Sequence, residues 1–507
     1  MKTISNFKKS LPTLLVLFMV SLASYAQQFS PQYFRHYDQR GVNVFETRKA
    51  DSSTFDGVKL RIGANFTQGF QTLRHSNSAR AILTSTGLPT LMETDPGSGS
   101  FVNQATGVAV PGIVQHPTIY GNYTNATNQL YINNNELFDL SNGFPLAQAN
   151  LNLDVQLADG VRLNLVSYMS AHHHNEFWVK GGYIQVDKVG FLNSDFMDRV
   201  WKNVTLKVGH MEVNYGDSHF RRNDGGNTFY NPFIENNIMD AYSTEIGGEL
   251  YWQKRGIIAM VGLTDGEIQG SVTKRNDRKP SIYGKLGYDK PFGELGRARI
   301  TGSFYTTKSS ISNTIYGGDR TGSNYQYVME PMAATLTGNA FSGRVNPGFK
   351  DNVTALMINP FIKYAGVEFF GTWEMSRGNS QVENGEVQYS NSALGEVSKL
   401  SNRQFNQLEA DLLYRFGKNQ KFYLGAKYNT IKGTLAFGQS TTATSINQGT
   451  RGDVSINRTS VAAGWFITSN IMFKAEYVNQ VYKDYPDTNI LSGGKFNGLV
   501  LQGSIGF

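Results

Sequence analysis

The sequence predicts an all-β protein, a transmembrane antiparallel β-barrel of about 16 strands with short periplasmic turns and long extracellular loops. Segments of about a dozen residues alternate apolar and polar side chains, and the connections between them alternate in length. After the amino-terminal leader, no apolar stretch approaches the roughly 20 residues of a spanning helix. Lipid offers no hydrogen-bond partner, so every backbone N–H and C=O inside a membrane must be paired within the protein, which helices and closed barrels achieve. Without a spanning helix, a closed barrel is the membrane architecture that remains.

Residues 1–26 have the layout of a secretory signal peptide. Lys2, Lys8 and Lys9 precede an apolar run at 11–23, and Ser24-Tyr25-Ala26 places small residues before a cleavage site near Ala26. The chain has no cysteine, which excludes a lipoprotein anchor, disulfides and thiolate metal sites. We therefore expect three parts: signal peptide 1–26, periplasmic amino-terminal lead 27–56 and barrel 57–507.

The charge balance argues against nucleic acid as a partner. Without the three signal lysines the chain has 44 basic and 40 acidic residues, a net charge of +4. The basic residues are scattered along the chain and form no stripe interleaved with aromatic residues. The mean hydropathy of −0.35 fits apolar residues diluted by alternation.

The strands follow the lead in order. Residues 27–56 show no periodicity, and we expect them to be too short for a folded plug. The first strand, 58–71, is followed by one large polar loop, 73–144, with a short strand near 129–132. Fifteen further ranges alternate in the same way: 147–157, 161–171, 176–186, 203–215, 241–253, 257–263, 281–288, 297–305, 353–362, 367–375, 405–416, 421–431, 454–467, 471–481 and 499–507.

The connections distinguish a barrel from a secreted β-sandwich. Tight turns, such as those near Gly160 and Gly256, alternate with long connections such as 216–240 and 306–352, apart from a short one at His172-His173-His174. A sandwich does not require this alternation, whereas a barrel with turns in the periplasm and loops outside does. Totals of 14 or 18 strands remain open, because boundaries read from one sequence shift by a few residues.

The final strand carries the signal for barrel closure. Leu499, Leu501, Ile505 and Phe507 share one face, and Gln502 and Ser504 the other. A terminal aromatic residue resembles the carboxy-terminal signature of Gram-negative outer-membrane proteins. This resemblance implies localisation in the outer membrane, contact with its lipid and handling by the barrel-assembly machinery. Closure also requires this strand to pair with 58–71.

Polar side chains of the strands are expected to line a water-filled lumen. Their charges nearly balance, and both signs are tolerated by a channel but not by lipid. The basic set is Lys59, Arg61, Arg162, Lys180, Lys207, Lys285, Arg297, Arg299, Arg415, Lys427 and Lys474. The acidic set is Asp154, Glu176, Glu245, Glu249, Glu368, Glu374, Glu409, Asp411 and Glu476.

The loop 216–233 is the candidate pore constriction. It concentrates His219, Arg221 and Arg222, and paired guanidinium groups in a channel would attract anions. The alternative is an extracellular loop that never enters the pore. The preceding passage, 192–216, resembles phosphate-selective porins O and P, which implies a sixteen-stranded trimer that carries anions passively. The nearly balanced wall departs from the basic pathway of those porins.

These observations favour a passive porin for small hydrophilic solutes with at most a weak anion preference. It would be a homotrimer without cofactor or catalytic residues. The alternative is an occluded barrel for substrate binding or transport, for phospholipase-like activity, or as an accessory of an envelope complex. The histidines at 172–174 suggest no metal site, because neighbouring residues of a strand point to opposite faces.

Overall fold

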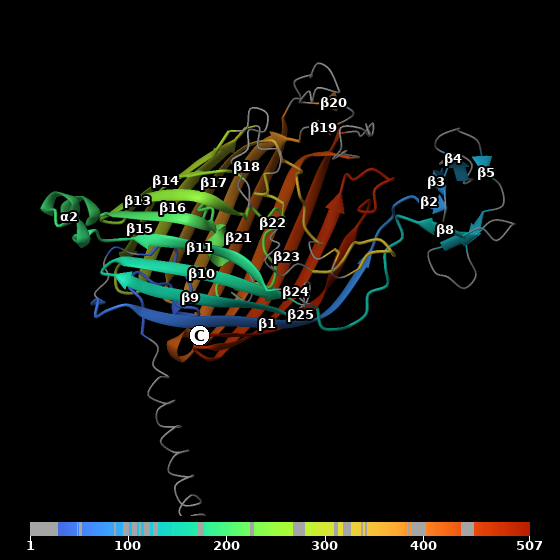
Figure 1. The fold of residues 1–507 in the computed structure, drawn as a ribbon. Coiled ribbons are helices and arrows are strands. Elements are labelled where there is room, and N and C mark those ends of the chain that lie inside the picture. Colours follow the sequence, from blue (N-terminus) through green and yellow to red (C-terminus); the bar gives the residue numbers. More distant parts are fainter. Residues whose placement is uncertain are drawn as a thin grey trace, which may run out of the picture.

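Sixteen strands close into one antiparallel barrel, and each of the sixteen predicted strands is present. Figure 1 shows the barrel as a ribbon. The strands are β1 (Lys59–Ser76), β9 (Gln148–Ala158), β10 (Val161–Ser170), β11 (Trp178–Val186), β12 (Val204–Glu212), β13 (Thr244–Lys254), β14 (Ile257–Thr264), β15 (Ser281–Phe292), β16 (Gly296–Thr307), β17 (Asn352–Tyr364), β18 (Val367–Asn379), β21 (Arg403–Phe416), β22 (Phe422–Ala436), β23 (Arg451–Thr468), β24 (Ile471–Lys483) and β25 (Lys495–Gly506).

The structure, a computed structural model, describes residues 29–47, 49, 53–85, 88–94, 101–103, 109–110, 113–115, 122–124, 130–145, 147–170, 177–223, 228–266, 279–308, 313–317, 326–335, 338–339, 342–380, 382–383, 386–387, 402–437 and 451–507. Within these ranges no helix is long and apolar enough to cross a membrane.

The first and last strands close the barrel, as predicted. β1 pairs with β25 from Asn65 opposite Gly506 to Ser76 opposite Lys495. Beyond β25, Phe507 N donates to Ala64 O at 3.0 Å and Ala64 N donates to Phe507 O at 3.1 Å. The terminal residue therefore takes part in the seam, which leaves neither strand with an open edge.

Alternation along the strands separates a lipid face from an inner face. On β1, Leu60, Ile62 and Phe66 are exposed on the outside, whereas Arg61 and Asn65 are buried inside the barrel. Leu499 and Ile505 on β25 are likewise exposed, while Gln502 and Ser504 are buried. A side-chain period of two produces this division, so the outer surface is an apolar belt suited to lipid.

A row of aromatic rings marks the interface at the turn end of the barrel. Neighbouring outward-facing rings stack at centroid distances of 5.7–6.0 Å along Tyr414, Phe416, Phe422 and Trp465. Where the sequence places two aromatic residues side by side, one faces outward and the other inward: Trp252 is exposed but Tyr251 is buried. The outward members form the girdle that the sequence suggests.

The two ends of the barrel differ as expected. One end carries tight turns, such as Ala365-Gly366 between β17 and β18, and the short helix α2 (Asp195–Trp201) with η3 (Gly190–Leu192) and η5 (Lys418–Gln420). Gly366 has a φ of +95°, and a Cβ there would lie 2.4 Å from Arg415 O, so this turn requires glycine. The long connections leave the opposite end.

The prediction of one large polar loop after β1 is wrong, because this connection contains a second sheet. Its seven short strands are β2 (Ile82–Ser85), β3 (Leu88–Thr94), β4 (Phe101–Asn103), β5 (Ala109–Val110), β6 (Val114–Gln115), β7 (Asn122–Thr124) and β8 (Leu130–Asn133). β8 matches the short strand expected near 129–132. Four of these strands, β4 to β7, have only two or three residues, which is too few to show a period of two. A two-stranded ribbon, β19 (Val382–Glu383) with β20 (Glu386–Val387), lies between β18 and β21.

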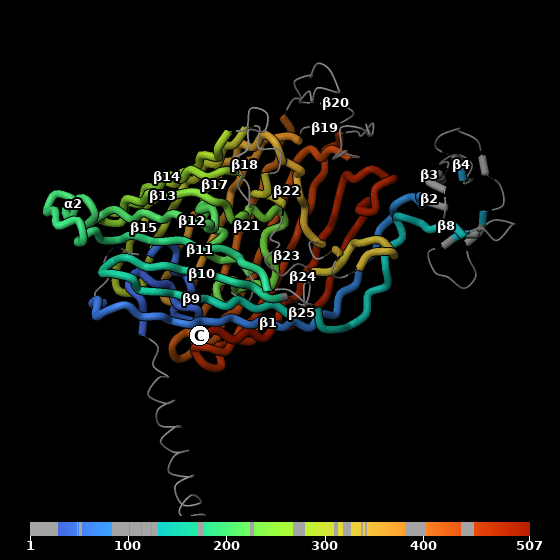
Figure 2. The backbone as a smooth tube through the Cα atoms, in the orientation of Figure 1, coloured from blue at the N-terminus to red at the C-terminus, as the bar shows by residue number. Residues whose placement is uncertain are grey.

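The expectation of an open, water-filled lumen is also wrong for the described residues. Inward-facing wall residues such as Tyr283 and Tyr305 are fully buried, and they pack with Ile234, Ile238 and Val328 from long connections that enter the barrel. The lead, in blue in Figure 2, also lies inside, at the turn end. Its length excludes a folded domain, but an extended segment covers about 3.3 Å per residue and can cross a barrel.

Candidate functional site

The connection between β12 and β13 folds into the lumen and is fastened to the opposite wall. Lys474 Nζ on β24 donates to the carbonyl oxygens of Thr228 and Asn231 at 3.1 Å and to that of Phe233 at 2.8 Å. Tyr423 Oη donates to Pro232 O at 2.8 Å. We call the described residues of this connection, 213–223 and 228–243, the inward loop. Polar wall residues thus serve as acceptors and donors for this loop.

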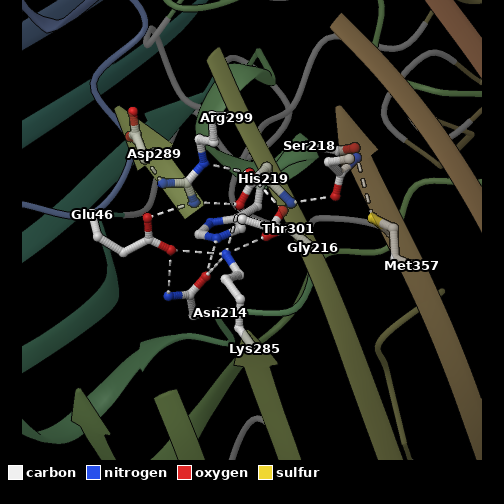
Figure 3. A network of polar contacts seen from close by, with 12 residues as sticks. Glu46, Asn214, Gly216, Ser218, His219, Lys285, Asp289, Arg299, Thr301 and Met357 are labelled. Atoms are coloured by element: carbon white, nitrogen blue, oxygen red, sulfur yellow. Dashed lines mark hydrogen bonds and ion pairs between the residues drawn. The ribbon is translucent and has the colours of Figure 1, made fainter. Parts of the chain in front are cut away.

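Asp217 is the centre of the ion-pair network that fixes the start of the inward loop. Figure 3 shows its partners Lys285, Arg299 and Thr301. Asp217 lies just before η4 (Ser218–Arg221) and accepts from Lys285 Nζ at 2.8 Å, from Arg299 at 2.7 and 2.9 Å and from Thr301 Oγ1 at 2.8 Å. Burial alone would raise the pKa of Asp217, but the charges of Arg299 and Lys285 outweigh it and hold the pKa well below its usual range.

Gly216 lets the loop approach the wall closely. Its φ is +70°, and a Cβ there would lie 2.0 Å from Met357 Sδ. Its carbonyl oxygen accepts a hydrogen bond from Lys285 Nζ at 2.7 Å. The glycine therefore brings the backbone next to β17 and directs it into the Asp217 network.

Glu46 of the lead completes this network from the other side. Its carboxylate lies 3.0 Å from Lys285 Nζ and 2.6 Å from Arg299 Nη2. Burial would raise the pKa of Glu46, but these two cations lower it to about 2. Two carboxylates and two cations thus compensate one another inside the barrel, as buried charges require.

The three predicted constriction residues all lie inside the barrel, each with its own partners. His219 Nε2 lies 2.9 Å from Asn214 Oδ1, and burial lowers the pKa of the imidazole. Arg221 Nη1 donates to Glu368 Oε1 at 2.8 Å, and Arg222 Nη2 lies 2.5 Å from Asp240 Oδ2. Because carboxylates neutralise both guanidinium groups, their role as anion contacts stays a prediction.

Most of the predicted wall charges are paired along the inner face. Lys427 Nζ lies 3.3 Å from Glu409 and 3.6 Å from Asp411, and Arg415 donates to Glu368 at 2.9 Å. Arg162 lies 3.6 Å from Asp154, and Arg297 lies 2.5 Å from Asp289. Pairing of neighbouring charges explains how both signs share one wall.

The remaining wall residues of the prediction use other partners. Glu249 accepts from Tyr283 Oη and Glu245 from Tyr305 Oη, both at 2.9 Å. Arg61 donates to Phe29 O at 3.2 Å. Lys59, at the start of β1, is partly exposed and pairs with Asp56. Glu176 lies outside the described residues.

A cavity of about 190 Å³ remains beside β9–β13. The lead, the inward loop and the wall line it together, with aromatic side chains and the cations of Arg35 and Lys207. Lys207 Nζ donates to Tyr251 Oη at 3.4 Å and lies 4.9 Å from the centroid of the Tyr251 ring. This cavity is one of the spaces that a small solute could occupy; two others among the described residues, of about 290 and 460 Å³, also border the lead.

Several carboxylates that pair with the predicted cations were not singled out by the sequence, among them Asp217, Glu46 and Asp240. Glu46 lies in a segment without periodicity, and Asp240 lies in a long connection. One signal for the inward loop was available: residues 228–242 contain Phe229, Tyr230, Phe233, Ile234, Ile238, Met239 and Tyr242 in a stretch that follows no strand pattern. Such apolar content indicates a buried connection rather than a solvated one.

Metal and catalytic groups can be judged only within the described ranges. There, no group of three or more histidine or acidic side chains is arranged to hold a metal ion, and the histidines at 172–174 lie outside those ranges. Ser218 Oγ bonds with Thr372 Oγ1 at 2.9 Å, while the adjacent His219 bonds with Asn214, so the two do not form a nucleophile–base pair.

Comparison with known proteins gives similar solved structures at low identity. No family model and no curated protein sequence matches the chain. It is similar to OmpT, an outer membrane protein of Vibrio cholerae (9% identity, 90% of this chain and 99% of that chain, TM-score 0.41). It is also similar to the anion-selective porin from Comamonas acidovorans (9% identity, 89% of this chain and 100% of that chain, TM-score 0.42). A third similar structure is the outer membrane channel DcaP of Acinetobacter baumannii (10% identity, 89% of this chain and 98% of that chain, TM-score 0.40).

The architecture defines the class as a membrane-spanning β-barrel of sixteen strands with an occupied lumen. At TM-scores of 0.42 and below, the similar structures carry no argument about function. The resemblance to phosphate-selective porins O and P stays a prediction.

Proposed function

We propose that this chain is an outer-membrane porin, a passive diffusion channel for small hydrophilic solutes whose path is narrow. The observation that carries the proposal is the division of the barrel into an apolar outer belt and an inner wall of charges of both signs. A sixteen-strand barrel is wide enough to hold an aqueous path in addition to inward-folded segments.

The solute path would run through the cavity beside β9–β13. The lining of this cavity includes four cations, Arg35, Arg162, Lys180 and Lys207, and three carboxylates, Glu46, Glu212 and Glu249, and this small excess of positive charge favours a weak preference for anions. We further propose export to the outer membrane after cleavage near Ala26, assembly through the terminal strand with Phe507, and a homotrimer. Light scattering of the detergent-solubilised protein measures its molar mass, which should correspond to three chains.

Reconstitution into planar bilayers tests the channel function. We expect stepwise conductance increments, with a reversal potential in a salt gradient that indicates weak anion preference. Detergent carrying no protein, and the same preparation after heat denaturation, are the controls. Absence of conductance steps from folded protein would refute the proposal.

The second candidate is an occluded barrel that binds a solute without passing it freely. The packed lumen and the cavity of about 190 Å³ favour it. A folded protein that binds a solute in equilibrium dialysis but shows no conductance would support this candidate against the first.

A further inference from the structure

We propose that the lead segment 29–47 is a built-in plug whose position sets the width of the channel. The barrel would conduct poorly while the segment is seated and better once it is withdrawn. This inference concerns the regulation of the lumen and rests on the proposed channel function. It replaces the expectation that the lead is too short to obstruct the barrel.

The segment crosses the lumen from one side to the other. Near its beginning, Gln32 N donates to Gln156 Oε1 on β9 at 2.8 Å. Further along, Tyr37 Oη donates to Asp154 Oδ2 on the same strand at 2.8 Å. Near its end, Glu46 pairs with Lys285 on β15 and with Arg299 on β16. In the ring of sixteen strands, β15 and β16 lie six and seven places from β9, almost half a circumference away. A segment bonded at both places must pass between them.

Between Tyr37 and Glu46 the segment is held at Asn43, which has three partners. Asn43 Nδ2 donates to Glu368 Oε2 on β18 at 2.6 Å, Arg221 Nη1 donates to Asn43 Oδ1 at 2.5 Å, and Arg297 Nη1 donates to Asn43 O at 2.8 Å. The neighbouring Phe45 is 2% exposed and packs against Phe361 and Phe370. The crossing is therefore a specific, packed position.

The segment also closes against the inward loop. Arg35 Nη2 donates to Phe220 O at 2.8 Å, and its guanidinium carbon lies 3.7 Å from the centroid of the Tyr230 ring. Tyr230 Oη in turn donates to His36 O at 2.7 Å. The lead and the inward loop thus fill the turn end of the lumen together.

The barrel does not need the segment to be complete. It contributes no strand to the closed ring, and apart from the single turn η1 (Gln39–Gly41) it has no regular structure in its described residues. The contacts with the wall named above are made through side chains or charges. Withdrawal would break the buried ion pairs of Glu46 and expose Phe45, so the seated position is the favoured one, and water entering the lumen would then hydrate the wall groups left behind.

The first experiment compares single-channel conductance of the full chain with that of a variant lacking residues 29–47. We expect the deletion to raise conductance several-fold. Glu46→Gln, which loosens the seated end without removing the segment, should give more frequent open events. Asp56→Asn is the matched control, because it neutralises an exposed carboxylate outside the lumen and should behave as the full chain.

The second readout does not depend on conductance. The chain contains no cysteine, so Asn65→Cys places a single thiol on the wall of β1. Asn65 is 1% exposed, and its Nδ2 lies 3.3 Å from Tyr37 O of the lead. We expect a membrane-impermeant thiol reagent to label this cysteine in the deletion variant and to spare it in the full chain. Asp56→Cys should be labelled in both.

The outcomes separate this inference from the channel function. Equal, non-zero conductance of the full chain and the deletion variant would overturn the plug while leaving the channel intact. If neither conducts, the channel proposal fails, and labelling decides the plug. Labelling of Asn65→Cys in the deletion variant alone supports an occluding segment, and equal labelling in both overturns it.

Discussion

At the scale of single residues, charge compensation inside the barrel determines how the lumen is organised. Asp217 and Glu46 come from two segments far apart in sequence, yet both meet Lys285 and Arg299. None of the four side chains is more than 3% exposed. A buried charge without its partner is costly, so each of them holds the others in place.

Replacing Asp217 by alanine should destabilise the folded barrel strongly. The substitution leaves Lys285 and Arg299 with Glu46 as their shared carboxylate, and breaking a buried pair typically costs about 3–5 kcal/mol. Urea unfolding in detergent, followed by tryptophan fluorescence, measures the change. Asp56→Asn removes an exposed charge and should leave the midpoint unchanged; an equal effect of both variants would contradict the role of Asp217.

Glu46 should contribute stability that disappears in acid. Its pKa in the folded chain is about 2, below the ordinary value of 4.5. A carboxyl group with a lowered folded pKa stabilises the fold above its unfolded pKa and loses this contribution as pH falls toward the folded pKa. The difference in thermal midpoint between the wild type and Glu46→Gln should therefore be constant from pH 8 to 5 and shrink below pH 4.5. A difference that does not change with acidification would refute the linkage.

At the scale of elements, each strand combines two environments through its period of two. β21 shows this in its burial: Leu408, Leu412 and Tyr414 are exposed to the lipid side, while Glu409 and Asp411 are buried in the lumen. Tyr414 belongs to the stacked aromatic row at the turn end, and Leu408 lies further toward the middle of the strand. Depth in the membrane therefore changes along one face of a single strand.

A positive charge on this face should cost more at Leu408 than at Tyr414. Arginine at the bilayer midplane destabilises a barrel by about 2–4 kcal/mol, and near the interface by about 0–1 kcal/mol. Leu408→Arg should accordingly lower the folding free energy in liposomes by the larger amount, with Tyr414→Arg as the matched control. Equal costs would contradict the position of the aromatic row at the interface.

At the scale of the whole molecule, closure makes the barrel one unit. The last strand pairs with the first over a register that places Thr72 opposite Leu499. Both residues lie on the outer face, so the seam is accessible to a covalent test. No native cysteine competes with an engineered pair.

Thr72→Cys with Leu499→Cys should form a disulfide on mild oxidation, because directly opposed residues bring their Cβ atoms within about 4.5–5.5 Å. Thr72→Cys with Leu501→Cys shifts the register by two residues and should cross-link poorly. Mobility of the denatured, unreduced protein on a gel detects the bond. Efficient cross-linking of the shifted pair and not of the direct pair would contradict the register.

The lumen shows where sequence reasoning reached its limit. Parity predicted an inward position for wall charges such as Glu409 and Asp411, which are buried, and the sequence placed Arg221 and Arg222 in a loop that could enter the barrel. Their partners did not follow, because Arg221 meets Glu368, 147 residues away, and Asn43, 178 residues away. The sequence offers no pattern that links such distant positions.

By itself, the sequence determined the sixteen strands, their two faces and the closing pair, because alternation and connection length are local properties of the chain. Only the tertiary structure decided that the lumen is filled by the lead, by the inward loop and by residues of other connections. Filling depends on pairings such as Glu46 with Lys285, 239 residues apart, whose free energy arises only when the closed wall brings the two charges together away from water.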